Sequence, residues 1–163
     1  MRLLRLLTAV VALSTGANCA NRVPKPVGVA PDTPHVSWVL MSGDRNNPDA
    51  DYVCQSDPKD ECVVSASRTD QPVFSNLHIY YHGAGGETRY TGSIRVGYFN
   101  NPSTLEPKIL VRKGKGITNQ SVTGIVTSKP GSYDVTFDLM ASNAEGAGQS
   151  IRQTLPVTVR QTQ

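Results

Sequence analysis

The sequence lacks a strong charge imbalance, and this excludes one broad class of partner. Its formal net charge is +3, with 16 basic and 13 acidic residues among 163. Without Arg2 and Arg5, which stand in the N-terminal leader, 14 basic residues remain against 13 acidic ones. Domains that bind nucleic acid carry a basic stripe or patch. The run VRKGKG at 111–116 has no interleaved aromatic residue and its glycines predict a solvated turn. We therefore expect no nucleic-acid partner.

Residues and motifs that carry catalysis are also few. The chain has three histidines, His35, His78 and His82, and no carboxylate is spaced to orient any of them. No G-x-S-x-G nucleophile motif occurs. The glycine-rich GAGGET at 83–88 lacks the Gly-Lys-Ser/Thr ending and the following helix of a phosphate loop. We expect a non-catalytic protein without a cofactor, and an enzyme of unknown class ranks third among the hypotheses.

No window of the sequence shows the apolar stripe of an amphipathic helix. Instead, short runs of β-branched and aromatic residues are separated by Gly, Pro, Asn and Asp, a pattern typical of strands and turns. We expect strands near 35–42, 61–67, 73–82, 88–99, 107–112, 121–128, 132–142 and 151–160. Strands this short and numerous predict an all-β fold, as a sandwich or a barrel.

The first 19 residues have the layout of a secretory signal peptide. Arg2 and Arg5 precede an apolar run over 6–13, and small residues follow it. Cys19 ends this stretch, and two outcomes stay open: lipid modification of Cys19, as in bacterial lipoproteins, or ordinary cleavage after Cys19 or Ala20. Either outcome predicts export to the periplasm or the cell exterior, with membrane attachment only through Cys19. Residues 20–34 are rich in proline and predict an extended linker ahead of one domain at 35–163.

Two cysteines remain beyond the leader, Cys54 and Cys62. An exported chain with two cysteines most often pairs them, so we expect a disulfide that closes a small ring. A zinc site would need two further ligands at suitable spacing. The disulfide is the preferred prediction.

The C-terminal third alternates with a period of two residues. In SYDVTFDLMAS the residues from Tyr133 to Ala141 alternate apolar and polar, and the closing run places Leu155, Val157 and Val159 on one face. Pro156 predicts an edge position, because proline cannot donate to a ladder.

PGSYDVTFDLMASNAEG followed by LPVTV resembles the last two strands of bacterial immunoglobulin-like and polycystic-kidney-disease-type domains. The residues that match are Pro130, Gly131, Tyr133, Asn143 and Gly146. The resemblance implies an immunoglobulin-like antiparallel β-sandwich of about seven to nine strands. It also implies a role in adhesion, spacing or display in the cell envelope, with a protein or a glycan as partner.

LHIYYH at 77–82 supplies the first candidate binding surface. Strand alternation predicts that Leu77, Ile79 and Tyr81 face the core, so that His78, Tyr80 and His82 face outward. If the next strand forms a hairpin with it through the glycines at 83–86, Arg89 joins this outer face. Exposed aromatic and arginine side chains are common at interfaces, so His78, Tyr80, His82 and Arg89 form a candidate face for a sugar or a protein. The two histidines cannot share one metal ion, because four strand residues separate them by about 13 Å.

An acidic stretch at 43–62 supplies the second candidate. Its carboxylates could gather calcium, and Asp44, Asp49 and Asp51 are the residues to test. Asp, Asn and Pro also form ordinary turns. The preferred prediction is a long loop closed by the disulfide, with a calcium site as its alternative.

Overall fold

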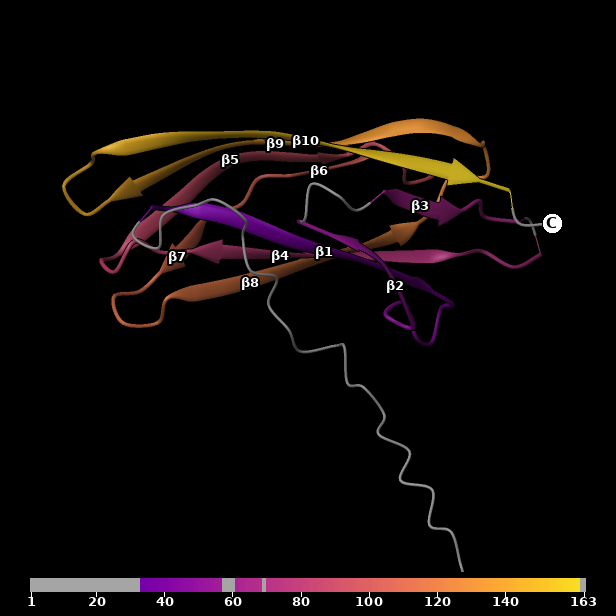
Figure 1. Ribbon diagram of the computed structural model, residues 1–163, viewed down its shortest axis with the longest axis horizontal. Helices are drawn as coiled ribbons and strands as arrows, with labels where there is room; N and C mark the ends of the chain where they lie inside the picture. The colour runs from indigo at the N-terminus through magenta and orange to yellow at the C-terminus, as the bar shows by residue number, and fades with distance from the viewer. Residues whose placement is uncertain (1–32, 57–60, 69, 162–163) are drawn as a thin grey trace, which may run out of the picture.

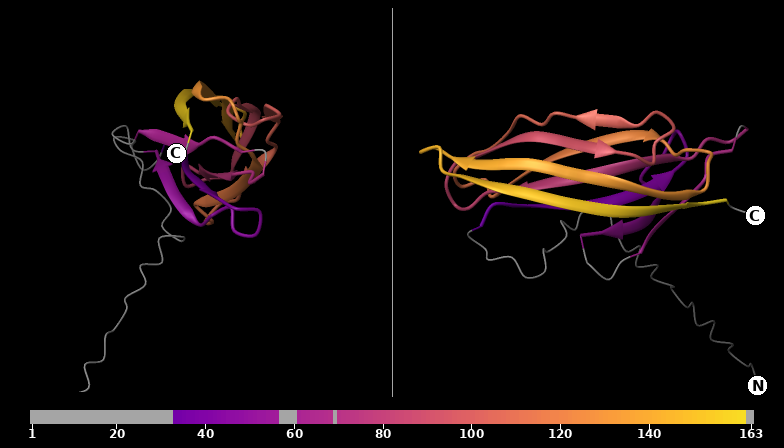
Figure 2. Two further views of the ribbon diagram at one scale, coloured as in Figure 1. Left: turned by 90° about the vertical axis from the view of Figure 1, so that its right-hand side faces the viewer. Right: turned by 90° about the horizontal axis from the view of Figure 1, so that it is seen from above.

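The protein is a two-layered β-sandwich in a computed structural model that describes residues 33–56, 61–68 and 70–161. Figure 1 shows the two layers and Figure 2 shows them from the end and from above. One sheet has the order β2-β1-β4-β8 and the other β3-β10-β9-β5-β6, with β7 also paired to β5. The strands are β1 (His35–Gly43), β2 (Asp51–Gln55), β3 (Cys62–Ser65), β4 (Phe74–His82), β5 (Thr88–Val96), β6 (Ser103–Leu105), β7 (Ile109–Val111), β8 (Ile117–Ile125), β9 (Gly131–Asn143) and β10 (Gly148–Arg160).

The predicted all-β sandwich is confirmed. The described part of the chain contains no helix, and therefore none long and apolar enough to cross a membrane. The predicted signal peptide and most of the predicted linker lie outside the described residues.

The core follows the predicted alternation. Leu77, Ile79 and Tyr81 of β4 are completely buried, as are Tyr90, Ile94 and Val96 of β5. β9 and β10 alternate as expected, with buried apolar residues at every second position in β9 from Val135 to Ala141. Pro156 lies where β10 is paired with β9 alone, because β3 joins β10 only from Val157 onward. Its edge position is confirmed at that point.

The predicted hairpin between 73–82 and 88–99 is wrong. β4 pairs with β1 and β8 in the four-stranded sheet, whereas β5 pairs with β9, β6 and β7 in the other sheet. The segment between them crosses from one layer to the other, and Tyr81 and Tyr90 meet across the core with their ring centroids 5.1 Å apart. The alternation of apolar and polar residues cannot distinguish a hairpin within one sheet from two strands in facing sheets. In both arrangements the apolar side chains face the same core.

Two further features differ from expectation. The stretch expected to be a long loop contains a strand, β2, which pairs with β1 through an irregularity between Leu40 and Met41. In addition, β3 runs parallel to β10, so that one pairing in an otherwise antiparallel fold is parallel.

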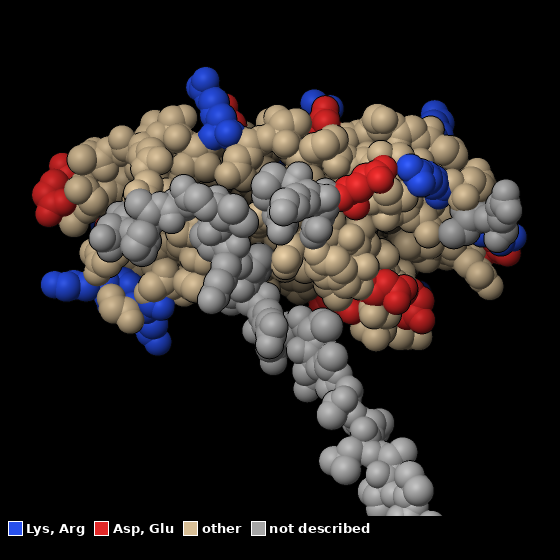
Figure 3. All heavy atoms as spheres, in the orientation of Figure 1, with Lys and Arg blue, Asp and Glu red and all other residues tan. Residues whose placement is uncertain are grey.

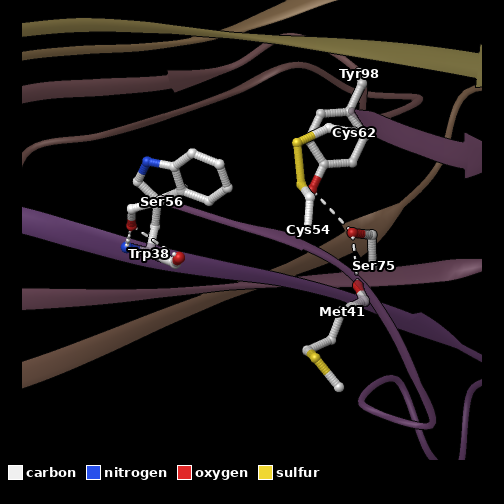
Figure 4. The surroundings of a disulfide bond; sticks show 7 residues. All are labelled: Trp38, Met41, Cys54, Ser56, Cys62, Ser75 and Tyr98. Carbon is white, nitrogen blue, oxygen red and sulfur yellow. Dashed lines mark hydrogen bonds between the residues drawn. A yellow bond between two sulfur atoms is a disulfide. The ribbon is translucent and has the colours of Figure 1, made fainter. Parts of the chain in front are cut away.

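The predicted disulfide between Cys54 and Cys62 is confirmed, and it does more than close a local ring. Cys54 lies on β2 in the four-stranded sheet and Cys62 on β3 in the other, so the bond joins the two layers (Figure 4). Both cysteines are buried. Next to it, the Ser75 hydroxyl bonds to the Tyr98 hydroxyl at 2.9 Å and to the Met41 carbonyl at 3.0 Å.

Candidate functional site

The structure brings together one residue from each of the two predicted candidate sites. Asp49, in the loop between β1 and β2, lies over the outer face of the four-stranded sheet. Its Oδ1 accepts hydrogen bonds from His78 Nε2 at 3.0 Å and from Asn76 Nδ2 at 2.8 Å. On its other side the His78 ring bonds through Nδ1 to Ser121 Oγ at 2.8 Å, across the pairing of β4 with β8. The acidic loop and the histidine face are therefore one surface.

This carboxylate–imidazole–hydroxyl order is also that of a hydrolase relay. A hydrolase additionally needs a substrate cleft and hydrogen-bond donors for the oxyanion beside its nucleophile. A cavity of about 450 Å³ in the described part of the chain is lined by residues other than Asp49, His78 and Ser121. The contacts of Asp49 instead account for the position of the loop, since Asn76 and His78 tie it to β4.

The other two acidic candidates, Asp44 and Asp51, are not placed beside His78 by any contact of the described residues. Asp44 Oδ1 accepts hydrogen bonds from the backbone N–H groups of Asn46 and Asn47, which is the Asx-turn role of an aspartate. Asp51 is exposed at the first position of β2. Within the described residues no group of three or more His, Cys, Asp or Glu side chains is placed to hold a metal ion. The calcium hypothesis stays a prediction, without support from this geometry.

Tyr80 lies on the same outer face and is half-buried. Burial raises the pKa of its hydroxyl, and the negative charge of Asp49 raises it further. Its hydroxyl is therefore protonated at neutral pH and can donate a hydrogen bond. Tyr80 and His78 therefore share this face with the Asp49 loop.

His82 does not belong to that surface. Alternation predicts that it faces solvent, but only 8% of it is exposed. Its Nε2 lies 2.7 Å from the hydroxyl of the buried Ser37, and its ring stacks on that of His35 with centroids 4.1 Å apart. Two causes lower the pKa of His82 to about 4: chiefly the burial of its ring, and also the charge of the neighbouring His35. His82 is thus a neutral structural residue under physiological conditions.

Arg89 is also separated from the predicted face. It lies on β5 in the six-stranded sheet, where its guanidinium bonds to Glu87 at 3.2 Å. Since that sheet is the other layer, Arg89 and His78 lie on opposite outer faces. Of the four predicted ligand-binding residues, only His78 and Tyr80 form one surface.

A groove between the two sheets has no counterpart among the sequence predictions. Among the described residues, β1 pairs with β2 only from Val39 onward and β10 pairs with β3 only from Val157 onward, so the described strands leave part of each edge unpaired on this flank. Between these edges lies a cavity of about 450 Å³. Its lining combines apolar and polar side chains: Val36, Trp38, Ser56, Glu61, Cys62, Gln153, Thr154, Leu155, Pro156 and Thr158. We call it the flank groove.

Trp38 is held in place in the floor of the flank groove by Ser56. Its backbone N–H donates to Ser56 Oγ and its carbonyl accepts from the Ser56 N–H at 3.0 Å (Figure 4). The one signal in the sequence that could have pointed here is that Trp38 is the single tryptophan. The groove itself could not be found in this way, because it depends on where β2 and β3 end.

Charged side chains are unevenly placed on the molecule. In Figure 3 acidic side chains gather at the lower right, over the loop between β1 and β2, and basic ones at the lower left, by the turn between β7 and β8. Much of the visible surface between these ends is uncharged.

Comparison with known proteins gives no family for this chain. No family model matches it, and a search of curated proteins finds no relative.

Proposed function

We propose that the chain is a non-catalytic, immunoglobulin-like binding module of the cell envelope, exported through its leader and attached to the membrane, if at all, through Cys19. The observation that carries the binding role is the flank groove. It is large enough to hold part of a ligand, and it joins an apolar floor at Val36, Trp38 and Leu155 to a rim of hydroxyl and amide side chains. Ligand sites generally combine these two kinds of lining.

The preferred ligand is an extended polypeptide segment. Both walls of the flank groove are strand edges, His35–Ser37 on β1 and the residues of β10 that precede Val157. A peptide strand can pair through its backbone with the short β1 edge, while pockets select its side chains and the β10 edge, interrupted by Pro156, forms the opposite wall. A carbohydrate is the second candidate, because Trp38 stands beside Thr154, Gln153 and Ser56, and an aromatic side chain with polar neighbours suits a sugar.

The single tryptophan makes the proposal directly testable. Titration with a library of extended eight-residue peptides, and separately with a panel of glycans, should change the fluorescence of Trp38 for ligands that enter the groove. Thr154→Arg should block that change, whereas Gln149→Arg, at an exposed position of β10 outside the groove, should leave it intact. Binding that Thr154→Arg does not weaken would show that the groove is not the site.

Export and anchoring need a separate measurement. The intact mass of the chain purified from a membrane fraction should show a new N-terminus at Cys19, with or without a diacylglyceryl group, or one just after it. An unprocessed leader would contradict the export proposal.

A further inference from the structure

Between Asn119 and Thr123, β8 has the longest strand edge without charge or proline that the described part of this fold leaves unpaired. At its two ends, Thr118 Oγ1 donates to the Leu110 carbonyl and the Ile125 carbonyl accepts from the Asn100 N–H. β8 ends the four-stranded sheet, and within the described residues β4 is the only strand with which it pairs. Its nine residues, ITNQSVTGI, include no charged residue and no proline. Free edges of this kind readily pair with another chain, and natural proteins usually protect them with charge, proline, bulges or short length.

The other edges of the two sheets carry such protection. β2 and β3 have five and four residues, and β6 and β7 have three each. β10 is long, but Arg152 and Pro156 interrupt the part of it that β3 does not cover. Among these edge strands, β8 alone is long and carries neither a charged residue nor a proline.

The backbone groups that β8 presents can be assigned from its flanks. Just beyond β8, the Val126 N–H donates to Val73 on the side of β4, whereas the Ile125 carbonyl accepts from the Asn100 N–H on the opposite side. Alternate residues of a strand point their backbone groups to opposite sides. Asn119, Ser121 and Thr123 therefore point theirs away from β4, as Ile125 does. We call these three residues, with Gln120 and Val122 between them, the β8 edge.

Exposed apolar side chains flank the β8 edge. Ile117 is 39% exposed at one end of β8 and Ile125 is 37% exposed at the other. Leu110, on β7 beside the first residues of β8, is 39% exposed. They are three of the five large hydrophobic side chains that are exposed in the described part of the chain. Ile117 and Ile125 stand at the two ends of β8, where a strand that paired along this edge would cover them.

We propose that the β8 edge is a self-association surface, on which a second copy of this chain pairs its own β8 edge in antiparallel orientation about a two-fold axis at Ser121. Asn119 then faces Thr123 of the other copy, and Ile117 approaches Ile125 of the other copy. Every facing pair is uncharged, and the strand is close to self-complementary about its centre, as a two-fold interface requires. The product is one continuous sheet across both copies, made from the two four-stranded sheets.

The size of the β8 edge and the charges beside it determine how tightly the two copies should associate. A pairing of five residues, with Ile contacts at each end, lies at the small end of specific interfaces, so we expect a weak dimer with a Kd between about 1 μM and 1 mM. Lys113 and Lys115 precede β8 and Lys129 follows it, so antiparallel pairing brings like charges near one another at both ends. Added salt screens that repulsion and should strengthen association.

The proposal is tested by sedimentation equilibrium of the folded domain, with charges introduced at two outward-facing positions. Wild-type protein should sediment as a monomer–dimer equilibrium. Asn119→Lys combined with Thr123→Lys places lysines opposite each other and should weaken association by tenfold or more. Asn119→Lys combined with Thr123→Glu places opposite charges in the same register and should restore association.

A matched control separates the β8 edge from other open strands. Gln149→Lys combined with Gln153→Lys adds the same charge to the free part of β10 and should leave the equilibrium unchanged. A monomer at all concentrations up to about 1 mM would overturn the proposal, and so would open-ended assemblies, since a two-fold contact closes on itself. Failure here leaves the groove proposal intact, because the flank groove lies between β1 and β10.

Discussion

At the scale of single residues, environment decides the role of each histidine. His78 and His82 are four residues apart on one strand and share an outer face, yet the Asp49 loop covers one while the other is buried against Ser37 and His35. Period-two alternation assigns a face correctly but does not show what lies above it. The predicted solvent-facing role of His82 is wrong for that reason.

Burial of His82 predicts a loss of stability in mild acid. The folded-state pKa is about 4 and the ordinary value is 6.5, so the unfolded state binds more protons between these values. Stability from neutral His82 is complete above pH 6.5 and is lost as the pH falls toward 4. Urea denaturation at pH 7 and pH 4 should differ by at most about 3 kcal/mol from this group.

The pH effect can be assigned to His82 by substitution. His82→Gln should flatten the pH dependence between 6.5 and 4, whereas His78→Gln should preserve it. An unchanged slope in His82→Gln would assign the loss to other groups. His35 is the nearest titratable neighbour, stacked on the His82 ring.

The Asp49–His78 contact should contribute measurably to stability. We expect a double-mutant cycle with Asp49→Ala and His78→Ala to give a coupling free energy of about 1 kcal/mol, because the two side chains share a partly buried hydrogen bond. Asp51→Ala, a nearby exposed aspartate, should change the free energy of unfolding by about 0.5 kcal/mol or less. Zero coupling would mean that the loop is held by other contacts.

At the scale of strands, the close approach of the β9 backbone restricts which residue β5 can carry at position 92 more than strand propensity does. Gly92 has a φ of 127°, and a Cβ at this position would lie 2.2 Å from the backbone carbonyl oxygen of Asp138 on β9. The Asp138 backbone, unlike the end of a flexible side chain, cannot move aside to make room for this Cβ. Glycine is therefore required here for both conformation and space.

Replacement of Gly92 should weaken the β5–β9 pairing. We expect Gly92→Ala to lower the free energy of unfolding by about 2 kcal/mol or more, as measured by chemical denaturation. Gly86→Ala is the control and should be close to neutral, because a Cβ at that position would meet nothing within 4 Å beyond its chain neighbours. Equal effects from the two substitutions would contradict this account.

At the scale of the whole molecule, the disulfide holds the two layers together at one end. It links β2 to β3, which are short strands of five and four residues. Although the ring is small, the bond acts between sheets rather than within one loop. It also borders the flank groove, since Cys62 lines that groove.

Removal of the disulfide should destabilise the domain and disturb the groove. We expect Cys54→Ala combined with Cys62→Ala to lower the free energy of unfolding by about 2 to 3 kcal/mol. Trp38 fluorescence should change as well, because Ser56 holds Trp38 two residues after Cys54. Unchanged stability would show that the layers are joined sufficiently by their shared core.

The sequence by itself determined the all-β class, the inward faces of β4, β9 and β10, and the pairing of Cys54 with Cys62. These follow from local rules, namely side-chain alternation, turn chemistry and the small number of cysteines. Tertiary structure alone decided that β4 and β5 lie in different sheets, that Asp49 reaches His78, that Arg89 lies on the far face, and where the flank groove opens. Those features depend on which strands become neighbours, and a single core can be closed by several strand orders that bury the same apolar faces.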